Sequence, residues 1–472
     1  MRKSPEQVSE ADVGGRRFWH PKIQICPLNR LRPSKRNART HSKKQREKLL
    51  AIIRRFGFIN PILTDESGNI VAGHLRRTVA EELGMKEVPV IQITHLTDVE
   101  KRALALAENR IALDAGWDRE TLAAELGELA VLLPDAEIDL SITGFDIAET
   151  DMIIADHSDP SEMAREDHVP DPGPSVSQLG DLWIMDRHRL YGGDARDSAA
   201  YARLMRGQAA AMVFSDPPYN VSIKTHARGR SRVTFDEFAM ASGEMSDRAY
   251  QRFLERALEA FAVVCVNGSI IYLCVDWRHL RQLLEAGELV FSEVKNVVVW
   301  VKPNGGQGTF YRSQHEFICV FKKGNAAHAN SFELGQHGRT RTNVWSYAGV
   351  NSFRAGRQED LDAHPTVKPV RLVADAMLDC SRRGSVVLDP FMGSGTTIIA
   401  AESVGRRAYG IELDPRYVDV AVRRWQSFTG KDATLEATGQ TFAEVEAERN
   451  EGVASEIEPA RRRSRVRKEG RR

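Results

Sequence analysis

The segment FSDPPYN, residues 214–220, places a carboxylate, two prolines and an aromatic ring directly after an apolar run. The exocyclic amine of a nucleobase shares its lone pair with the ring, so it needs acceptors for its N–H bonds before it can attack a methyl group. The Asp216 carboxylate and the Pro217 carbonyl can accept those hydrogens, and Pro218 stiffens the backbone. Tyr219 adds a face on which a base can stack. In isolation, the same residues could form a simple turn that ends a strand.

A second candidate is the run SVVLDPFMGSGTT, in which an apolar stretch ends at Asp389 and a glycine turn follows. Gly393 and Gly395 let the backbone approach a ligand closely, and a helix that begins near Thr396 would offer free amides. Glu412 ends the next apolar run, 23 residues after Asp389, where an acid can accept hydrogen bonds from ribose hydroxyls. An acid beside the glycines suits an ammonium group and a positive sulfur better than a pyrophosphate, which favours S-adenosylmethionine over NAD. A glycine turn alone could be a tight strand-to-helix connection.

Together, DPPY and DPFMGSGTT resemble the paired motifs of amino-group DNA methyltransferases. The catalytic motif precedes the cofactor loop here, as in the circularly permuted beta class of that family. HPTVKP at 364–369 resembles the motif that precedes the glycine loop, and GDLWIMDRHRLYGGDA resembles the family's entry strand. The resemblance covers about residues 178–430.

The resemblance implies a role for each matching residue. The target base would be held by Asp216, Pro217, Pro218 and Tyr219. The implied cofactor, S-adenosyl-L-methionine, would be held by Asp194, Thr366, Lys368, Asp389, Phe391, Gly393, Gly395, Thr396 and Glu412. Because a base inside a duplex is out of reach, the target would be flipped out of DNA.

Target selection is expected from residues 324–363, which carry arginines and aromatic residues. Arginine can read guanine edges, and aromatic rings can wedge into a base stack. We therefore predict DNA contacts from Arg339, Arg341 and Arg354, with an ordinary basic loop on phosphates as the alternative.

The amino-terminal part resembles a second family, the ParB-like partition or nuclease fold, through LRPSKRNART, GFINPILT and IVAGHLRRTVAEELG. The matching turn implies an anion site at Gly73, His74, Arg76 and Arg77, and a nucleotide is a further candidate partner. His74 and Leu75 stand where Glu and Arg are usual, which puts nucleotide hydrolysis in doubt. The alternative is a solvated helix face.

DPPY is typical of adenine methylation, so we expect a site-specific DNA methyltransferase that acts on adenine N6. Ring-carbon methylation of cytosine is not favoured, because none of the five cysteines directly follows a proline. A cytosine-N4 enzyme is the near alternative. A ParB-like DNA-binding or scaffold protein with a non-catalytic methyltransferase half is the alternative from another class.

These motifs must be positioned by short Val- and Ile-rich runs that alternate with helical patterns. The runs include AMVFSD, SIIYLCVD and SVVLD. Such runs indicate a mostly parallel sheet buried on both faces, whose carboxyl edge binds ligands. We predict a doubly wound α/β methyltransferase fold in circularly permuted order, preceded by a small α+β ParB-like domain. The expected limits are a flexible start at 1–20, the ParB-like domain at 21–150, a linker at 151–178, the methyltransferase domain at 179–430 and a flexible basic tail at 431–472.

The bulk composition is that of a globular protein, with 42% apolar and 28% charged residues and a net charge of +1. No run of about 18 apolar residues exists, so we expect no membrane span. The cysteines show no C-x-x-C spacing, which argues against disulfides and zinc and fits a cytoplasmic protein. By resemblance, such fusions are typical of prophage genomes and restriction-modification systems, and a dimer is one candidate assembly.

Overall fold

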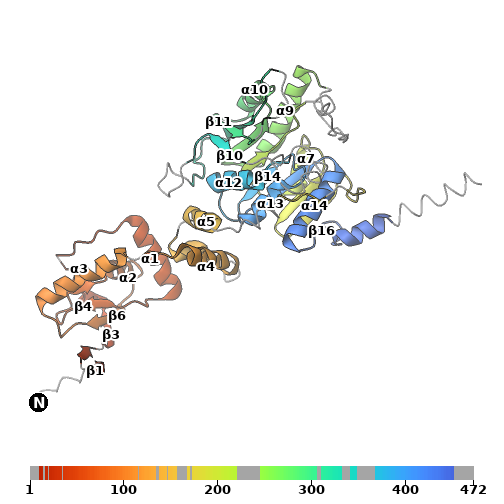
Figure 1. Ribbon diagram of the computed structural model, residues 1–472. Helices are drawn as coiled ribbons and strands as arrows, with labels where there is room; N and C mark the ends of the chain where they lie inside the picture. Colours follow the sequence, from red (N-terminus) through yellow and green to blue (C-terminus); the bar gives the residue numbers. More distant parts are fainter. Residues whose placement is uncertain are drawn as a thin grey trace, which may run out of the picture. The chain divides into compact units, whose positions relative to one another are not determined.

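The computed structural model describes residues 10–13, 16–19, 21–34, 36–114, 116–133, 138–145, 147–156, 167–170, 173–220, 245–303, 305, 310–331, 341–347 and 367–450. The chain divides into two compact units, Met1–Asp146 and Ile147–Arg472 (Figure 1). No helix in the described ranges is both long and apolar enough to cross a membrane.

The first unit is built on a four-stranded sheet in the order β3-β6-β4-β5. Strand β6 runs antiparallel to β3 and parallel to β4, so the sheet is mixed. Apolar residues such as Leu31, Ile62 and Val88 form its small core. Its elements are β1 (Glu10–Val13), β2 (Arg16–Trp19), β3 (Ile23–Pro27), η1 (Leu28–Arg30), α1 (Lys43–Phe56), β4 (Ile62–Thr64), β5 (Ile70–Ala72), α2 (His74–Glu82), β6 (Glu87–Gln92), α3 (Asp98–Asp114), α4 (Arg119–Leu132) and η3 (Leu140–Thr143).

Side-chain caps fix two helix starts in this unit. The Ser42 hydroxyl accepts the backbone N–H of Gln45 at 3.1 Å at the start of α1. At the start of α3, Glu100 accepts the backbone N–H of Thr97 at 2.7 Å, and the Thr97 hydroxyl accepts that of Glu100. Each cap satisfies amides that a helix leaves without an internal partner.

The second unit is built on a ten-stranded sheet in the order β13-β11-β12-β10-β9-β14-β15-β8-β7-β16. The central strands β10, β9, β14, β15 and β8 are parallel to one another. Its elements are α5 (Ile147–Asp156), β7 (Leu182–Met185), β8 (His188–Gly192), α7 (Ser198–Met205), β9 (Ala210–Ser215), α9 (Asp247–Ala262), β10 (Cys265–Val275), α10 (Leu280–Val290), β11 (Glu293–Val301), β12 (His315–Lys322), β13 (Val344–Ser346), α12 (Val370–Cys380), β14 (Val386–Asp389), α13 (Thr396–Ser403), β15 (Arg407–Glu412), α14 (Pro415–Thr429) and β16 (Thr434–Leu435).

Helices cover both faces of this sheet. Alternate residues of β10 point to opposite sides, so Tyr272 joins the core beneath α12, α13 and α14, whereas Leu273 joins the core beneath α7, α9 and α10. Figure 1 shows the sheet between these two helix layers. The doubly wound α/β fold predicted from the apolar runs is confirmed.

The two motif-bearing strands, β9 and β14, are neighbours at the point where the strand order reverses. From β9 the chain continues through α9 to β10 on one side, and from β14 it continues through α13 to β15 on the other. In open α/β sheets, ligands bind outside the carboxyl ends of strands at such a switch point.

The described residues near the end of the predicted linker and at the start of the predicted flexible tail pack into the second unit, and residues 157–166, 171–172 and 451–472 lie outside the described ranges. In the first, Val176 is buried in the core, and Asp419 accepts the backbone N–H groups of Val176 and Ser177 at 2.6 and 2.9 Å. In the second, Phe442 and Val445 are buried in the same core. Both segments look polar along the sequence because only a few of their residues face inward.

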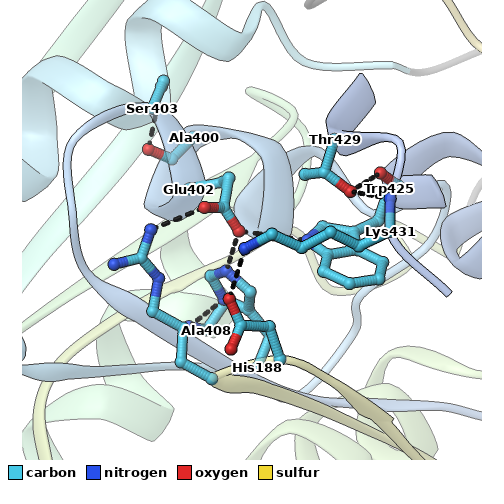
Figure 2. Close-up of polar contacts among 10 residues, drawn as sticks. His188, Ala400, Glu402, Ser403, Ala408, Trp425, Thr429 and Lys431 are labelled. Atoms are coloured by element: carbon cyan, nitrogen blue, oxygen red, sulfur yellow. Dashed lines mark hydrogen bonds and ion pairs between the residues drawn. The ribbon is translucent and has the colours of Figure 1, made fainter. Parts of the chain in front are cut away.

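A buried polar cluster ties β8 to α13, α14 and β15 (Figure 2). His188 is fully buried, its Nε2 lies 2.8 Å from Glu402, and its Nδ1 accepts the backbone N–H of Ala408 at 2.9 Å. The Trp425 indole also donates to Glu402, at 3.1 Å. Because every member has a partner, we interpret this cluster as a structural anchor.

Candidate active site

A cavity opens at the switch point between β9 and β14, and both motifs line it. The predicted site residues that line it are Asp194, Asp216, Pro217, Pro218, Tyr219, Lys368, Asp389, Phe391, Gly393, Thr396 and Glu412. Two segments more than 150 residues apart along the chain therefore meet at one cavity. Thr366 lies outside the described residues.

Asp216 is held on both carboxylate oxygens. The Tyr219 hydroxyl donates to Oδ1 at 2.5 Å, and the Lys368 ammonium donates to Oδ2. A carboxylate has about four acceptor positions, so these two bonds leave room for another donor. The Tyr250 hydroxyl donates to the Pro218 carbonyl at 3.0 Å and fixes the proline turn from α9.

Burial raises the pKa of Asp216 above its ordinary value, although the charge of Lys368 opposes that rise. Burial lowers the pKa of Lys368, but the adjacent carboxylates of Asp216 and Glu316 outweigh it and raise that pKa above the ordinary value. The lysine is therefore a cation, and it favours the ionised form of Asp216.

Glu316 and Lys302 extend this group and were not foreseen from the sequence. Glu316 Oε2 lies 3.3 Å from Lys368 Nζ, and Glu316 Oε1 lies 2.5 Å from Lys302 Nζ. Burial opposes ionisation of Glu316, yet the charges of Lys368 and Lys302 lower its pKa to about 2. The signal that was available is an acid at the start of an otherwise apolar strand, HEFICVF.

Asp389 organises the glycine turn. The hydroxyls of Ser215 and Thr397 donate to its two oxygens, each at 2.6 Å, and the backbone N–H of Phe391 donates at 3.1 Å. Burial raises the pKa of Asp389 to about 6, and these hydrogen bonds oppose the rise. Ser215 ends β9, so its bond joins the two motifs directly.

Glu412 lies on the other side of the turn. It accepts the backbone N–H of Gly393 at 2.8 Å and that of Asp414 at 2.8 Å. Burial raises the pKa of Glu412 to about 7, and the two backbone bonds oppose the rise. Among the described residues, no group of three or more His, Cys, Asp and Glu is placed to hold a metal ion.

Gly395 is not among the residues that line the cavity, and it precedes α13 as its N-cap in the left-handed region at φ 83°. A Cβ at this position would lie 2.8 Å from the Cβ of Ala421. The glycine therefore allows α13 to pack closely on α14.

Asp194 lines the cavity from the loop after β8 and forms hydrogen bonds with Arg196, the shortest at 2.6 Å. Its role in holding the cofactor stays a prediction.

Arg341, predicted to contact DNA, instead has carboxylate partners within the domain. Its Nε lies 3.0 Å from Asp379, and its guanidinium stacks 4.4 Å from the centre of the Trp345 ring. The side chain is 15% exposed and links the segment before β13 to α12, and its contact with DNA stays a prediction. Arg339 and Arg354 lie outside the described residues.

The predicted anion site of the first unit is largely occupied by protein contacts. Arg76 donates to the carbonyls of Asn60 and Pro61 at 3.1 and 2.7 Å, and Arg77 pairs with Glu81 at 2.9 Å. His74 accepts a backbone N–H at 3.2 Å, and burial lowers its pKa. Gly73 has the left-handed φ of 100° that a tight helix start requires.

Three families match the chain: "DNA methylase" over residues 210–423, "ParB N-terminal domain" over 17–110 and "ParB-methyltransferase HTH domain" over 120–179. The chain is 29% identical to the type II methyltransferase M.HinfI of Haemophilus influenzae, over 45% of this chain and 62% of that protein. It is 25% identical to M.HpaI of Haemophilus parainfluenzae, over 47% of this chain and 70% of that protein. A solved complex of M1.HpyAVI with SAM is similar at 19% identity and a TM-score of 0.37, covering 50% of this chain and 97% of that chain.

Proposed function

We propose that this chain, which belongs to the DNA methylases through residues 210–423 and carries a ParB N-terminal domain, methylates the N6 amine of adenine in DNA. The observation that carries the proposal is the meeting of the DPPY turn and the glycine turn at one cavity. The relatives are type II methyltransferases, and SAM is the ligand named in one solved neighbour.

One side of the cavity wall suits a cationic methyl donor, and the other side suits the amine that receives the methyl group. Acidic side chains Asp194, Asp389 and Glu412 lie on the side of the glycine turn, which favours a ligand with an ammonium group and a ribose. S-adenosylmethionine, when bound, supplies a methyl group on a positively charged sulfur.

On the other side, Asp216 and the Pro217 carbonyl accept the two N–H bonds of the target amine, and Tyr219 stacks on the ring. A new N–C bond forms as the methyl–sulfur bond breaks, and the proton lost from nitrogen passes to Asp216. Alignment of the reacting atoms supplies much of the rate enhancement.

Tritium transfer from labelled S-adenosylmethionine to mixed-sequence DNA tests this function. Asp216→Asn keeps the shape of the side chain but loses the charge, so we expect transfer to fall at least about a hundredfold. Glu293→Gln, on the exposed part of β11, is the matched control and should retain wild-type transfer.

Digestion of the labelled DNA to nucleosides identifies the base. Label in N6-methyl-2′-deoxyadenosine supports the proposal, and label in N4-methyl-2′-deoxycytidine supports the near alternative. DNA retention without any label in the wild type would support the scaffold alternative instead.

For the first unit, we propose a nucleotide whose phosphates contact the start of α2. Support comes from the left-handed Gly73, which precedes a nine-residue helix whose first amides have no acceptor within the helix. Calorimetry of the full chain with CTP and ATP tests this proposal, and no heat of binding with either nucleotide would contradict it.

A further inference from the structure

Two lysines and two carboxylates alternate from the cavity into the sheet. Lys368 donates to Asp216, Glu316 lies 3.3 Å from Lys368, and Lys302 lies 2.5 Å from Glu316. Lys368 is 6% exposed, so water competes little for its ammonium. The four charges sum to zero, which is the condition under which buried ions are tolerated.

The elements on which these residues lie are held independently. Lys302 follows β11, Glu316 lies on β12, and the two strands are paired antiparallel with Val301 opposite His315. Lys368 precedes α12, and Asp216 follows β9. Glu316 therefore provides a fixed point on the sheet for a lysine that lies outside regular structure.

Asp216 must be a hydrogen-bond acceptor for the proposed reaction, yet burial favours its protonated form. A cation held in contact with it counteracts that tendency. The groups that interact with Asp216 are Lys368, Glu316 on β12, Tyr219 on its own turn, Tyr250 on α9, Cys274 on β10 and Asp389 on β14. Lys368 is the cation among them.

We propose that Glu316 is a positioning residue for methyl transfer: with Lys302 behind it, Glu316 holds the Lys368 ammonium against Asp216 so that this carboxylate can accept the target amine. The inference rests on the proposed function and deepens it. It adds Glu316 on β12 and Lys302 to the residues that act on the target amine together with the DPPY motif.

The test compares charge and position in the full chain. Glu316→Ala removes the contact and should lower kcat/KM by roughly tenfold or more, the scale of one charge-assisted hydrogen bond. Glu316→Gln keeps one acceptor oxygen and should lose less. Binding of S-adenosylmethionine, followed by calorimetry, should change less than kcat/KM in both variants, because the glycine turn is untouched and Lys368 is only one of the residues on the cofactor side of the cavity.

The pH profile separates positioning from a merely structural role. The charge of Glu316 raises the pKa of Asp216, so Glu316→Gln should move the acid limb of kcat/KM to lower pH. Lys302→Met leaves the charge of Glu316 uncompensated and should move the limb to higher pH. Glu293→Gln breaks an exposed Glu–Lys pair on β11 and should leave the acid limb of kcat/KM unchanged. The proposal would be overturned if the variants lost the same fraction of kcat/KM at every pH. It would also be overturned if Glu316→Gln and Lys302→Met moved the acid limb in the same direction.

A second measurement does not depend on activity. Lysine side-chain 1H–15N spectra should show a slowly exchanging ammonium signal that disappears in Lys368→Met and in Glu316→Ala. If the wild type labels no DNA, the proposed function fails, and this signal still decides whether Glu316 positions Lys368. Its persistence in Glu316→Ala would refute the positioning role.

Discussion

Lys368 lies in a motif whose resemblance implies a place beside the cofactor, yet its ammonium contacts the carboxylate of Asp216. The two placements are compatible, because the lysine also lines the cavity shared by both motifs. The residue type and motif were available from the sequence. The partner was not, because Asp216 and Glu316 reach Lys368 from strands distant along the chain. Partner identity is what turns a basic loop residue into part of an ion network.

At the same scale, Glu412 gives a pH-dependent prediction for cofactor binding. Its pKa is raised to about 7 by burial, and the ionised carboxylate accepts hydrogen bonds from ribose hydroxyls more strongly, and on both oxygens, than the protonated acid does. Affinity for S-adenosylmethionine should therefore strengthen as pH rises from 6 to 8 and weaken by up to about tenfold per pH unit well below the pKa. Calorimetry at the two pH values measures this, and Glu412→Gln should bind weakly with a smaller pH dependence, because Asp389, whose pKa is about 6, still titrates near the lower value. Equal wild-type affinity at both pH values would contradict the assignment.

At the scale of elements, the sequence predicted the motif-bearing strands because apolar runs, glycine stops and acids mark their ends. The strand that ends at Asp389 and the helix that begins at Thr396 are present. The packed segments around Val176 and Phe442 were missed because single inward residues leave no periodic pattern in a polar stretch. The carboxylate partner of Arg341 could not be predicted from the sequence, because Asp379 lies in a helix distant along the chain.

The glycine turn offers a prediction at this scale. Gly395→Ala places a residue with a Cβ at φ 83° and brings that Cβ to 2.8 Å from Ala421, so α13 must shift away from α14. We expect a loss of roughly 2 kcal/mol in the free energy of unfolding and weaker binding of S-adenosylmethionine.

Gly430→Ala is the matched control for the backbone conformation, because its φ is 71° and no atom lies within 4 Å of an added Cβ. Its free energy of unfolding should fall by only about 1 kcal/mol, which is the cost of placing a Cβ in the left-handed conformation. Urea titration of both variants separates the two contributions. Equal losses would show that the contact with Ala421 is not limiting.

At the scale of the whole molecule, the division between the units falls just before α5, and one acid of α5, Asp151, forms ion pairs within the second unit. Asp151 is 3% exposed in its side chain and lies 2.7 Å from Arg406 and 2.8 Å from Arg383. Arg406 is fully buried, and the Asp151 carboxylate compensates its charge. The chain that leads from the first unit is thus fixed to the methyltransferase unit by a buried ion pair.

This ion pair predicts that one nearly isosteric substitution in α5 destabilises the second unit. Asp151→Asn leaves the buried Arg406 charge without its carboxylate and should lower the free energy of unfolding of the second unit by about 3 kcal/mol. The control Asp432→Asn, at an exposed position of the same unit, should stay within about 0.5 kcal/mol of wild type. Urea unfolding followed by tryptophan fluorescence measures both variants, and the buried Trp183, Trp300 and Trp425 report on this unit. A wild-type midpoint for Asp151→Asn would show that α5 is held by its apolar contacts, and the boundary between the units would then not depend on the ion pair.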